Sequence, residues 1–235
     1  MTSLSVLSGG AAQGLVASLA PKFKAQTGFD ITGEFGAVGA MAQKLRQEMP
    51  TDIVILTAAL VAKLAEEKLV VASSIVDVGL VETALAVRQR DPLLMVRDEA
   101  DLRRALLASD AIFVPDTEVS TAGIHVAKVL AQIGIADAIA PRLRIYPNGA
   151  TAMRHLAASD ARKPIGCTQS TEIISTEGVV LSGSLPVGCG LSTMYTAAVT
   201  TQARNPQEAQ ALINLLISAD ARGLRERAGF LSGAS

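Results

Sequence analysis

The alternation of strand-like and helix-like segments constrains the fold of this 235-residue chain more than any other feature. Short apolar runs that predict buried strands, such as residues 52–58, alternate with stretches of helical period, such as residues 11–28. No internal repeat, charge block or low-complexity linker interrupts the pattern. Such alternation is typical of parallel strands joined by crossover helices. The sequence therefore predicts an α/β fold.

Two longer strand-like segments, VETALAVRQR from Val81 and LSTMYTAAVTT from Leu191, divide the pattern, and a second set of strand and helix units lies between them. We predict two lobes, with a ligand in the cleft between them at the carboxyl ends of the strands, where helix N-termini converge. Asn205 before Pro206 predicts the N-cap of a closing amphipathic helix. The predicted boundaries are 1–81 and 202–235 for lobe 1, 91–190 for the inserted lobe 2, and 82–90 and 191–201 for two crossing strands.

Composition and charge exclude several classes of partner. The formal net charge of −1 and the lack of an aromatic platform argue against nucleic-acid binding. The apolar runs fall short of the roughly 20 residues that a membrane span requires, so we expect no membrane insertion. Cys167 and Cys189 match neither a disulfide framework nor a zinc spacing, and we interpret them as core residues. We expect neither a metal nor a cofactor.

The N-terminal stretch MTSLSVLSGG enters a strand-like segment directly, without the basic region and apolar core of a leader peptide. We therefore expect a cytoplasmic protein if Met1 is the native start, and a periplasmic one if a leader preceded it and was removed.

The stretch IGCTQSTEI, residues 165–173, combines many neutral hydrogen-bonding side chains at a predicted strand-to-helix corner. It contains no His, Lys or Arg. A buried anion can be held by helix N-terminal N–H groups and hydroxyls without a full positive counter-charge. The stretch therefore predicts neutral donors for an anion at the start of a helix.

The order of several segments resembles that of type II periplasmic solute-binding proteins, and most closely the molybdate-binding proteins of ABC importers. These segments begin with LSVLSGGAAQGLVASLAPKFKAQTG and FDITGEFGAVGAMAQKL, continue through PTDIVILTA, VSTAGIHVAKVLAQIG and KPIG, and end with NPQEAQALINLLISADARGLRERAGF. Each segment alone is a weak signal, but their order over more than 200 residues is specific.

The resemblance implies a two-lobed fold with two crossing strands and a ligand pocket built from strand-to-helix corners. Small residues at such corners let the backbone approach a ligand closely. The residues implied to bind the ligand are Ser8, Gly9, Gly10, Ala11, Ala37, Val38, Gly39, Ser120, Thr121, Ala122, Asn148, Gly149, Thr168, Gln169 and Ser170.

Three positions depart from the molybdate-binding pattern. Ala11 and Val38 stand where that family contributes serine hydroxyls, and Gln169 stands where it contributes a tyrosine hydroxyl. Each missing donor to a charged group costs on the order of 1.5–3 kcal/mol. We therefore expect a small di- or tricarboxylate rather than molybdate, recognised by the remaining hydroxyl and amide groups, with Thr171 and Arg154 as further candidates. A purely structural role as turn and cap residues stays open for Asn148 and Ser120.

Two functions remain in competition. The first is a solute-binding protein for a small anion, with importer membrane subunits as partners if it is exported. The second is a cytoplasmic isomerase similar to aconitate isomerase, which would need a base near a carbon acid and donors for the resulting charge. Glu172, His125 and His155 are the only nearby candidates for that base, and the sequence assigns no catalytic residue.

Overall fold

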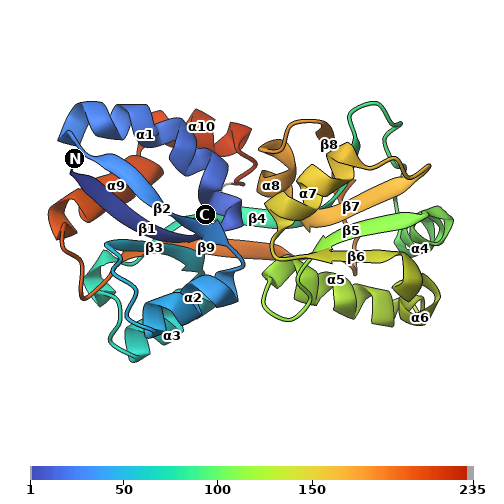
Figure 1. Ribbon diagram of the computed structural model, residues 1–235, viewed down its shortest axis with the longest axis horizontal. Helices are drawn as coiled ribbons and strands as arrows, with labels where there is room; N and C mark the ends of the chain where they lie inside the picture. The colour runs from blue at the N-terminus through green and yellow to red at the C-terminus, as the bar shows by residue number, and fades with distance from the viewer. Residues whose placement is uncertain (1, 232–235) are drawn as a thin grey trace. The chain divides into compact units, whose positions relative to one another are not determined.

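The computed structural model describes residues 2–231, which form two compact α/β units (Figure 1). Unit 1 contains the residues up to Val81 and those from Thr193 onward, and unit 2 contains Glu82–Ser192. The chain therefore leaves unit 1 once, completes unit 2, and returns.

Unit 1 is built on a sheet whose strand order is β2-β1-β3-β9-β4. The first three of these strands run parallel, and β9 is antiparallel to β3. Every residue of β3 is buried, as expected for a strand covered on both faces. The strands are β1 (Ser3–Gly9), β2 (Asp30–Gly36), β3 (Ile53–Thr57), β4 (Val76–Arg88) and β9 (Ser192–Val199).

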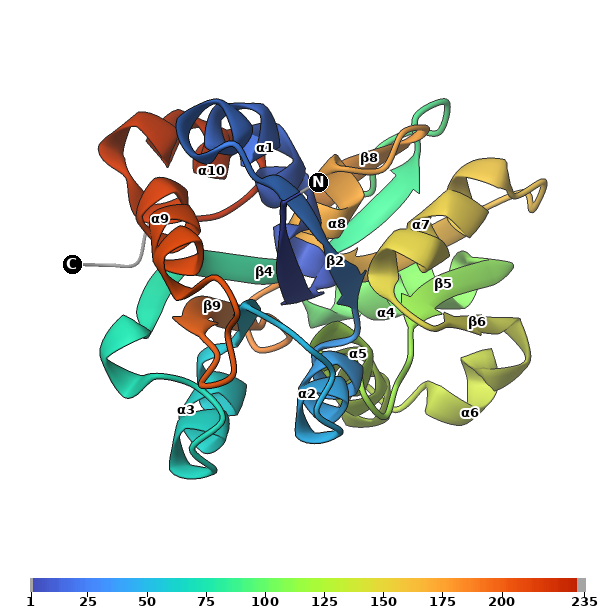
Figure 2. The ribbon, with the colours of Figure 1, turned by 60° about the vertical axis from the view of Figure 1, so that its left-hand side comes forward.

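Helices cover both faces of this sheet. Figures 1 and 2 show α1, α9 and α10 on one face and α2 and α3 on the other. The helices are α1 (Gln13–Thr27), α2 (Val38–Arg46), α3 (Ala58–Glu66), α9 (Pro206–Ile217) and α10 (Arg222–Arg227), with short 3₁₀ turns η1 (Gly10–Ala12), η2 (Ala72–Ser74) and η4 (Ala219–Ala221).

Unit 2 has the strand order β4-β7-β5-β6, with β8 paired to β4. Strands β7, β5 and β6 run parallel, with β6 at the edge of the sheet, whereas β4 is antiparallel to both β7 and β8. The strands beyond β4 are β5 (Ala111–Pro115), β6 (Leu143–Tyr146), β7 (Pro164–Gln169) and β8 (Val179–Ser184).

The alternation of side chains along β5 divides the core of unit 2 into two layers. Ile112 and Val114 pack with Leu102 in one cluster, and Phe113 packs with Met153 in another. Both views show α7 on the opposite side of these strands from α5 and α6 (Figures 1 and 2). The helices are α4 (Glu99–Ala108), α5 (Thr121–Gln132), α6 (Ala136–Ile139), α7 (Gly149–Ala158) and α8 (Ser170–Ile174), with η3 (Ala140–Arg142).

The structure differs from the sequence-based expectations at two element boundaries. The first long strand begins at Val76 rather than Val81. The closing helix is broken: α9 ends before Ser218, whose hydroxyl accepts a hydrogen bond from the N–H of Ala221 at 3.2 Å. Asn205 does stand at the N-cap of α9, but its side chain makes no capping bond and instead donates to the carboxylate of Asp52.

Both cysteines are buried free thiols, as predicted. Burial raises the pKa of Cys167 to about 12. Within residues 2–231 no single helix is long and apolar enough to cross a membrane. One bent pair of helices, Thr121–Gln132 with Ala136–Arg142, has the length and composition of a membrane span, on those two properties alone.

The first turn of α5 packs directly on the end of β5, which predicts the effect of Gly123→Ala. A Cβ at position 123 would lie 2.0 Å from the carbonyl oxygen of Asp116 and 2.6 Å from that of Pro115, so the backbone must shift. In open space the same change would favour a helix by roughly 1 kcal/mol. We expect urea unfolding to show a loss of about 1–3 kcal/mol instead.

Gly190→Ala is the matched control, because a Cβ at position 190 would lie 3.6 Å from its nearest neighbour, the carbonyl oxygen of Leu185. A Gly123→Ala protein as stable as the parent would contradict the close packing of α5 on β5.

Candidate functional site

The sequence-predicted site residues of unit 2 lie at three strand-to-helix corners. Because β7, β5 and β6 are parallel neighbours, their carboxyl ends lie at the same edge of the sheet. The structure therefore brings together the starts of α5, α7 and α8. The residues at this edge are Ser120, Thr121, Ala122, Asn148, Gly149, Thr168, Gln169 and Ser170.

The corner between β7 and α8 holds unpaired polar atoms in a buried position. Gln169 is only 3% exposed and stands at the N-cap of α8, yet neither its Nε2 nor its Oε1 has a hydrogen-bond partner among the described residues. The same holds for the hydroxyl of Thr83, which faces Gln169 in the β4–β7 register, and for that of Thr171. Folded proteins leave few such groups unpaired, so this corner points to a partner from outside the chain.

Beside this corner, the carboxyl group of Glu172 lies in a fully buried environment of hydrogen-bond donors. Thr168 Oγ1 donates to Glu172 Oε2 at 2.6 Å. The backbone N–H groups of Gln169, Ala150 and Gly149 also donate to it. Burial is the largest influence and raises the pKa of Glu172 above its ordinary value, while the four donors act in the opposite direction.

Glu172 thereby occupies the N-terminus of α7. It takes the first two N–H groups of that helix, and Asn148 Oδ1 accepts the N–H of Thr151 at 2.8 Å. Gly149 has no room for a side chain, because a Cβ would lie 1.9 Å from Glu172 Oε2. Asn148 is thus a capping residue in this structure, and ligand binding by Asn148 and Gly149 stays a prediction.

The start of α5 is different. Its N-cap residue, Ser120, is buried and makes no side-chain capping bond. The first N–H groups of a helix have no partner within the helix. Those of α5, including Thr121 and Ala122, are therefore available to an acceptor, in contrast to those of α7.

In unit 1, the predicted residues also form a common cluster at the ends of β1 and β2. A Cβ on Gly9 would lie 2.7 Å from Val38 Cγ1 and 2.8 Å from the Tyr195 ring, so the two corners and β9 meet there. Ser8 is buried, and its hydroxyl donates to the carbonyl of Gly9 at 2.9 Å. The remaining predicted residues of these corners are Gly10, Ala11, Ala37 and Gly39.

Tyr195 was missed by the sequence reading. It is 2% exposed, and its ring meets that of Phe230 edge-on at 6.4 Å. The one feature of the sequence that could have drawn attention to Tyr195 is that tyrosine is rare in this chain, which has only two. The contact with Gly9 is tertiary and leaves no trace in the local sequence.

The histidines and Arg154 contact other groups of the protein. His125 Nε2 lies 2.7 Å from the carbonyl oxygen of Cys189, and the ring of His155 stacks on Tyr146 at 4.3 Å. Arg154 bonds to the hydroxyl of Thr151 at 2.9 Å. In residues 2–231 no group of three His, Cys, Asp or Glu side chains could hold a metal ion.

The raised pKa of Glu172 predicts a pH-dependent contribution to stability. A carboxyl whose pKa is raised on folding stabilises the protein fully below its unfolded pKa, and this stabilisation is lost as pH rises through the folded pKa. Glu172→Gln removes this titration. We therefore expect the parent to lose stability relative to Glu172→Gln as pH rises above about 4, the ordinary pKa of a glutamate, measured by urea unfolding at each pH.

Glu177→Gln, an exposed substitution five residues along the chain, is the control for the loss of a carboxyl alone. A constant difference between the parent and Glu172→Gln at every pH would refute the assignment.

Comparisons with known proteins agree in fold and differ in ligand. The family described as bacterial extracellular solute-binding protein matches residues 4–231. An aconitate isomerase from a Pseudomonas species is 25% identical over 240 residues, covering 97% of this chain and 87% of that protein.

Two solved structures superpose over nearly the whole chain. The periplasmic molybdate-binding protein of Azotobacter vinelandii has a TM-score of 0.81 at 17% identity, covering 98% of this chain and 100% of that one. The sulfate-binding protein of Mycobacterium tuberculosis has a TM-score of 0.75 at 19% identity, covering 98% and 86%. At these identities the likeness concerns the fold.

Proposed function

Because the chain belongs to the bacterial extracellular solute-binding proteins, we propose that it binds a small di- or tricarboxylate at the carboxyl edge of the unit 2 sheet. Its type II periplasmic-binding-protein fold, expected from the sequence, is confirmed by its structural neighbours. The ligand-binding residues stay a prediction, as does the interlobe cleft.

The unpaired amide of Gln169 is the observation that carries the choice of ligand. An amide offers two N–H donors at Nε2 and an acceptor at Oε1, and both atoms lack partners among the described residues. A fully ionised tetrahedral oxyanion presents acceptors only, so it can satisfy Nε2 but not Oε1. A carboxylic acid that also carries a hydroxyl group can satisfy both.

The anionic part of such a ligand needs donors, and the neighbouring helix supplies them. The first N–H groups of α5 follow Ser120, which makes no side-chain capping bond. A helix N-terminus carries a partial positive charge and N–H groups directed outward, so it binds carboxylates without a full counter-charge. The hydroxyls of Ser120 and Thr121 add polar groups beside it.

A second candidate is an isomerase of small polycarboxylates. The full-length likeness to aconitate isomerase supports it. A base is what the described site lacks: the carboxyl of Glu172 is surrounded by four protein donors, and both histidines contact other groups. The isomerase therefore ranks second.

For the partner and the compartment, we extend the proposal to export and to delivery of the ligand to the membrane subunits of an importer. The family to which the chain belongs is described as extracellular, and the Azotobacter relative is periplasmic. Fractionation of the native cells tests this part separately.

Molybdate is expected to bind poorly. Ala11 and Val38 are buried hydrocarbon side chains at the two unit 1 corners, and neither can donate a hydrogen bond. A ligand that binds the folded state raises stability by RT ln(1 + [L]/Kd). We expect thermal-shift titrations to show stabilisation by citrate, isocitrate or malate and none by molybdate or tungstate. A large shift with molybdate would overturn the ligand class.

Gln169→Ala is expected to weaken binding of the carboxylate that scores best in this screen. Loss of a hydrogen bond to a charged group costs about 1.5–3 kcal/mol, which is roughly a 10- to 150-fold rise in Kd by calorimetry. Folding stability should not fall, because the amide has no hydrogen-bond partner among residues 2–231. Gln26→Ala, an exposed glutamine on α1, is the matched control.

Unchanged affinity in Gln169→Ala would remove this corner from the site. Incubation of the parent with cis- and trans-aconitate, followed by NMR, separates the two functions. Binding without conversion supports the solute-binding protein, and double-bond migration supports the isomerase.

A further inference from the structure

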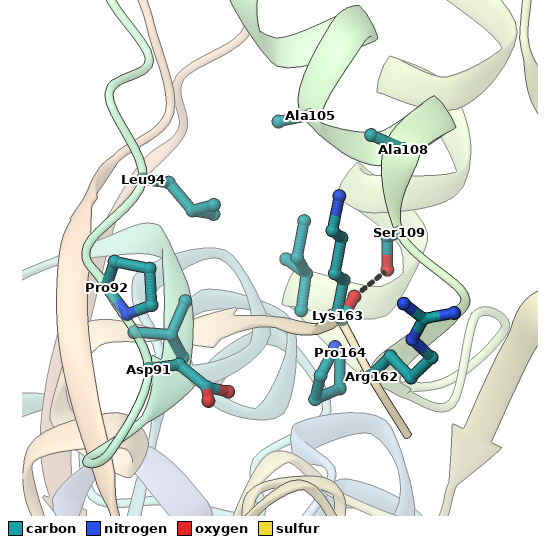
Figure 3. Close-up of a pocket in the computed structure, with 11 residues that line it drawn as sticks. Asp91, Pro92, Leu94, Ala105, Ala108, Ser109, Arg162, Lys163 and Pro164 are labelled. Atoms are coloured by element: carbon teal, nitrogen blue, oxygen red, sulfur yellow. Dashed lines mark hydrogen bonds between the residues drawn. The ribbon is translucent and has the colours of Figure 1, made fainter.

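Unit 2 contains a cavity at the end of its sheet opposite the candidate site. Pro164, the first residue of β7, lines it, whereas Gln169 is the last residue of that strand. The volume of the cavity is about 240 Å³, and Figure 3 shows the residues that line it. Pockets that hold drug-sized ligands are typically roughly 300–1,000 Å³, so an occupant here would be smaller.

Most of the cavity wall is hydrocarbon. Ala105 and Ala108 on α4 form one side, and Leu94, from the segment between β4 and α4, lies across from them (Figure 3). The small alanines leave space that larger side chains would fill. The N–H of Leu94 donates to Ser182 Oγ at 2.7 Å, which fixes that side of the wall.

One side of the cavity carries an uncompensated positive charge. The carboxylate of Asp91 accepts two hydrogen bonds from the guanidinium of Arg88, at 2.6 and 3.2 Å, so its charge is compensated. Arg162 lies near Asp110 and lowers the pKa of that carboxyl, after the larger effect of two backbone N–H bonds. The ammonium group of Lys163 has no hydrogen-bond or ion-pair partner in the part of the chain that the structure describes.

Lys163 is placed to combine both kinds of contact. Its side chain runs along the cavity toward Ala105 and Ala108, with the nitrogen at the far end (Figure 3). Its backbone N–H donates to Asp110 at 2.9 Å, which anchors its main chain. Such a side chain contributes apolar stem surface and a terminal cation.

We propose that this cavity is a second binding site, for a small amphiphilic carboxylate with an aromatic or short branched apolar body. The apolar body packs against Leu94, Ala105 and Ile165, and the carboxylate pairs with the Lys163 ammonium. A neutral apolar molecule of the same shape would forgo the ion pair, and a compact polycarboxylate would place unpaired charges against hydrocarbon. The site is therefore distinct from the proposed polycarboxylate site in both place and chemistry.

Phenylacetate is the probe, and two-dimensional NMR of the isotope-labelled full chain is the measurement. We expect saturable shifts for residues 87–94, 105–109 and 162–165. Lys163→Met keeps the stem and removes the charge, so it should weaken phenylacetate binding about tenfold or more. Phenylacetamide, which is neutral, should bind more weakly than phenylacetate to the parent and equally well to the parent and Lys163→Met.

Ala108→Leu should fill the cavity and abolish the shifts. Lys128→Met, an exposed lysine on α5, is the matched control and should leave binding unchanged. Gln169→Ala should also leave phenylacetate binding unchanged, which separates this proposal from the proposed function.

Absence of saturable shifts in the parent overturns the proposal. So do shifts that centre on Gln169, or phenylacetate binding that Lys163→Met does not weaken. If Ala108→Leu does not fold, Lys163→Met and phenylacetamide still decide the question.

Discussion

The buried carboxyl group of Glu172 determines how unit 2 presents its polar edge. It accepts hydrogen bonds from Thr168 Oγ1 and from the backbone N–H groups of Gln169, Gly149 and Ala150, and so ties the β7–α8 corner to the start of α7. A buried carboxyl without such partners would be strongly unfavourable. The absence of a side chain at Gly149 allows this close approach. Positions 149, 168 and 172 are therefore interdependent, and none can be changed without affecting the other two.

The hydrogen bonds of Glu172 also determine which polar groups stay free to contact a ligand. The first donors of α7 are consumed within the protein, whereas those of α5 follow an N-cap residue that makes no side-chain bond. The amide of Gln169 lies at the end of β7, the strand beside β5, and both its donor and its acceptor are unpaired among the described residues. The proposed site would therefore distinguish ligands by where they carry hydrogen-bond donors, and not only by their charge.

The sequence predicted the order of elements well because periodicity is a local property. The end of α1 at Gly28 follows from its left-handed conformation, with φ of 78°, which glycine adopts easily. The start of β4 and the break after Ile217 were not predicted. In the second case the sequence remains helix-compatible, and the break depends on Ser218 and on packing that involves other parts of unit 1.

The candidate site was predictable in its corners and not in its contacts. Strand-to-helix corners are visible in the sequence, so Ser120, Asn148 and Gln169 could be named. The sequence could not show which of these corners already binds another side chain of the protein. Glu172 accepts N–H groups at the start of α7 although it comes from a different strand-to-helix corner. Asn205 shows the same limit: its side chain bonds Asp52, 153 residues away in sequence, rather than its own helix.

The protonation state of Glu172 bears on how an anion could bind beside it. Burial favours the neutral form of this carboxyl, and a nearby anion would favour it further, since like charges repel strongly where water is scarce. If ionised, Glu172 would repel the ligand while holding the N–H groups of Gly149 and Ala150. If protonated, it carries no negative charge, and one of its four accepted hydrogen bonds is lost or reversed, as rotation of the Thr168 hydroxyl would allow. The charge of this corner can therefore adjust to an anion, so a buried carboxyl group is compatible with the proposed carboxylate site.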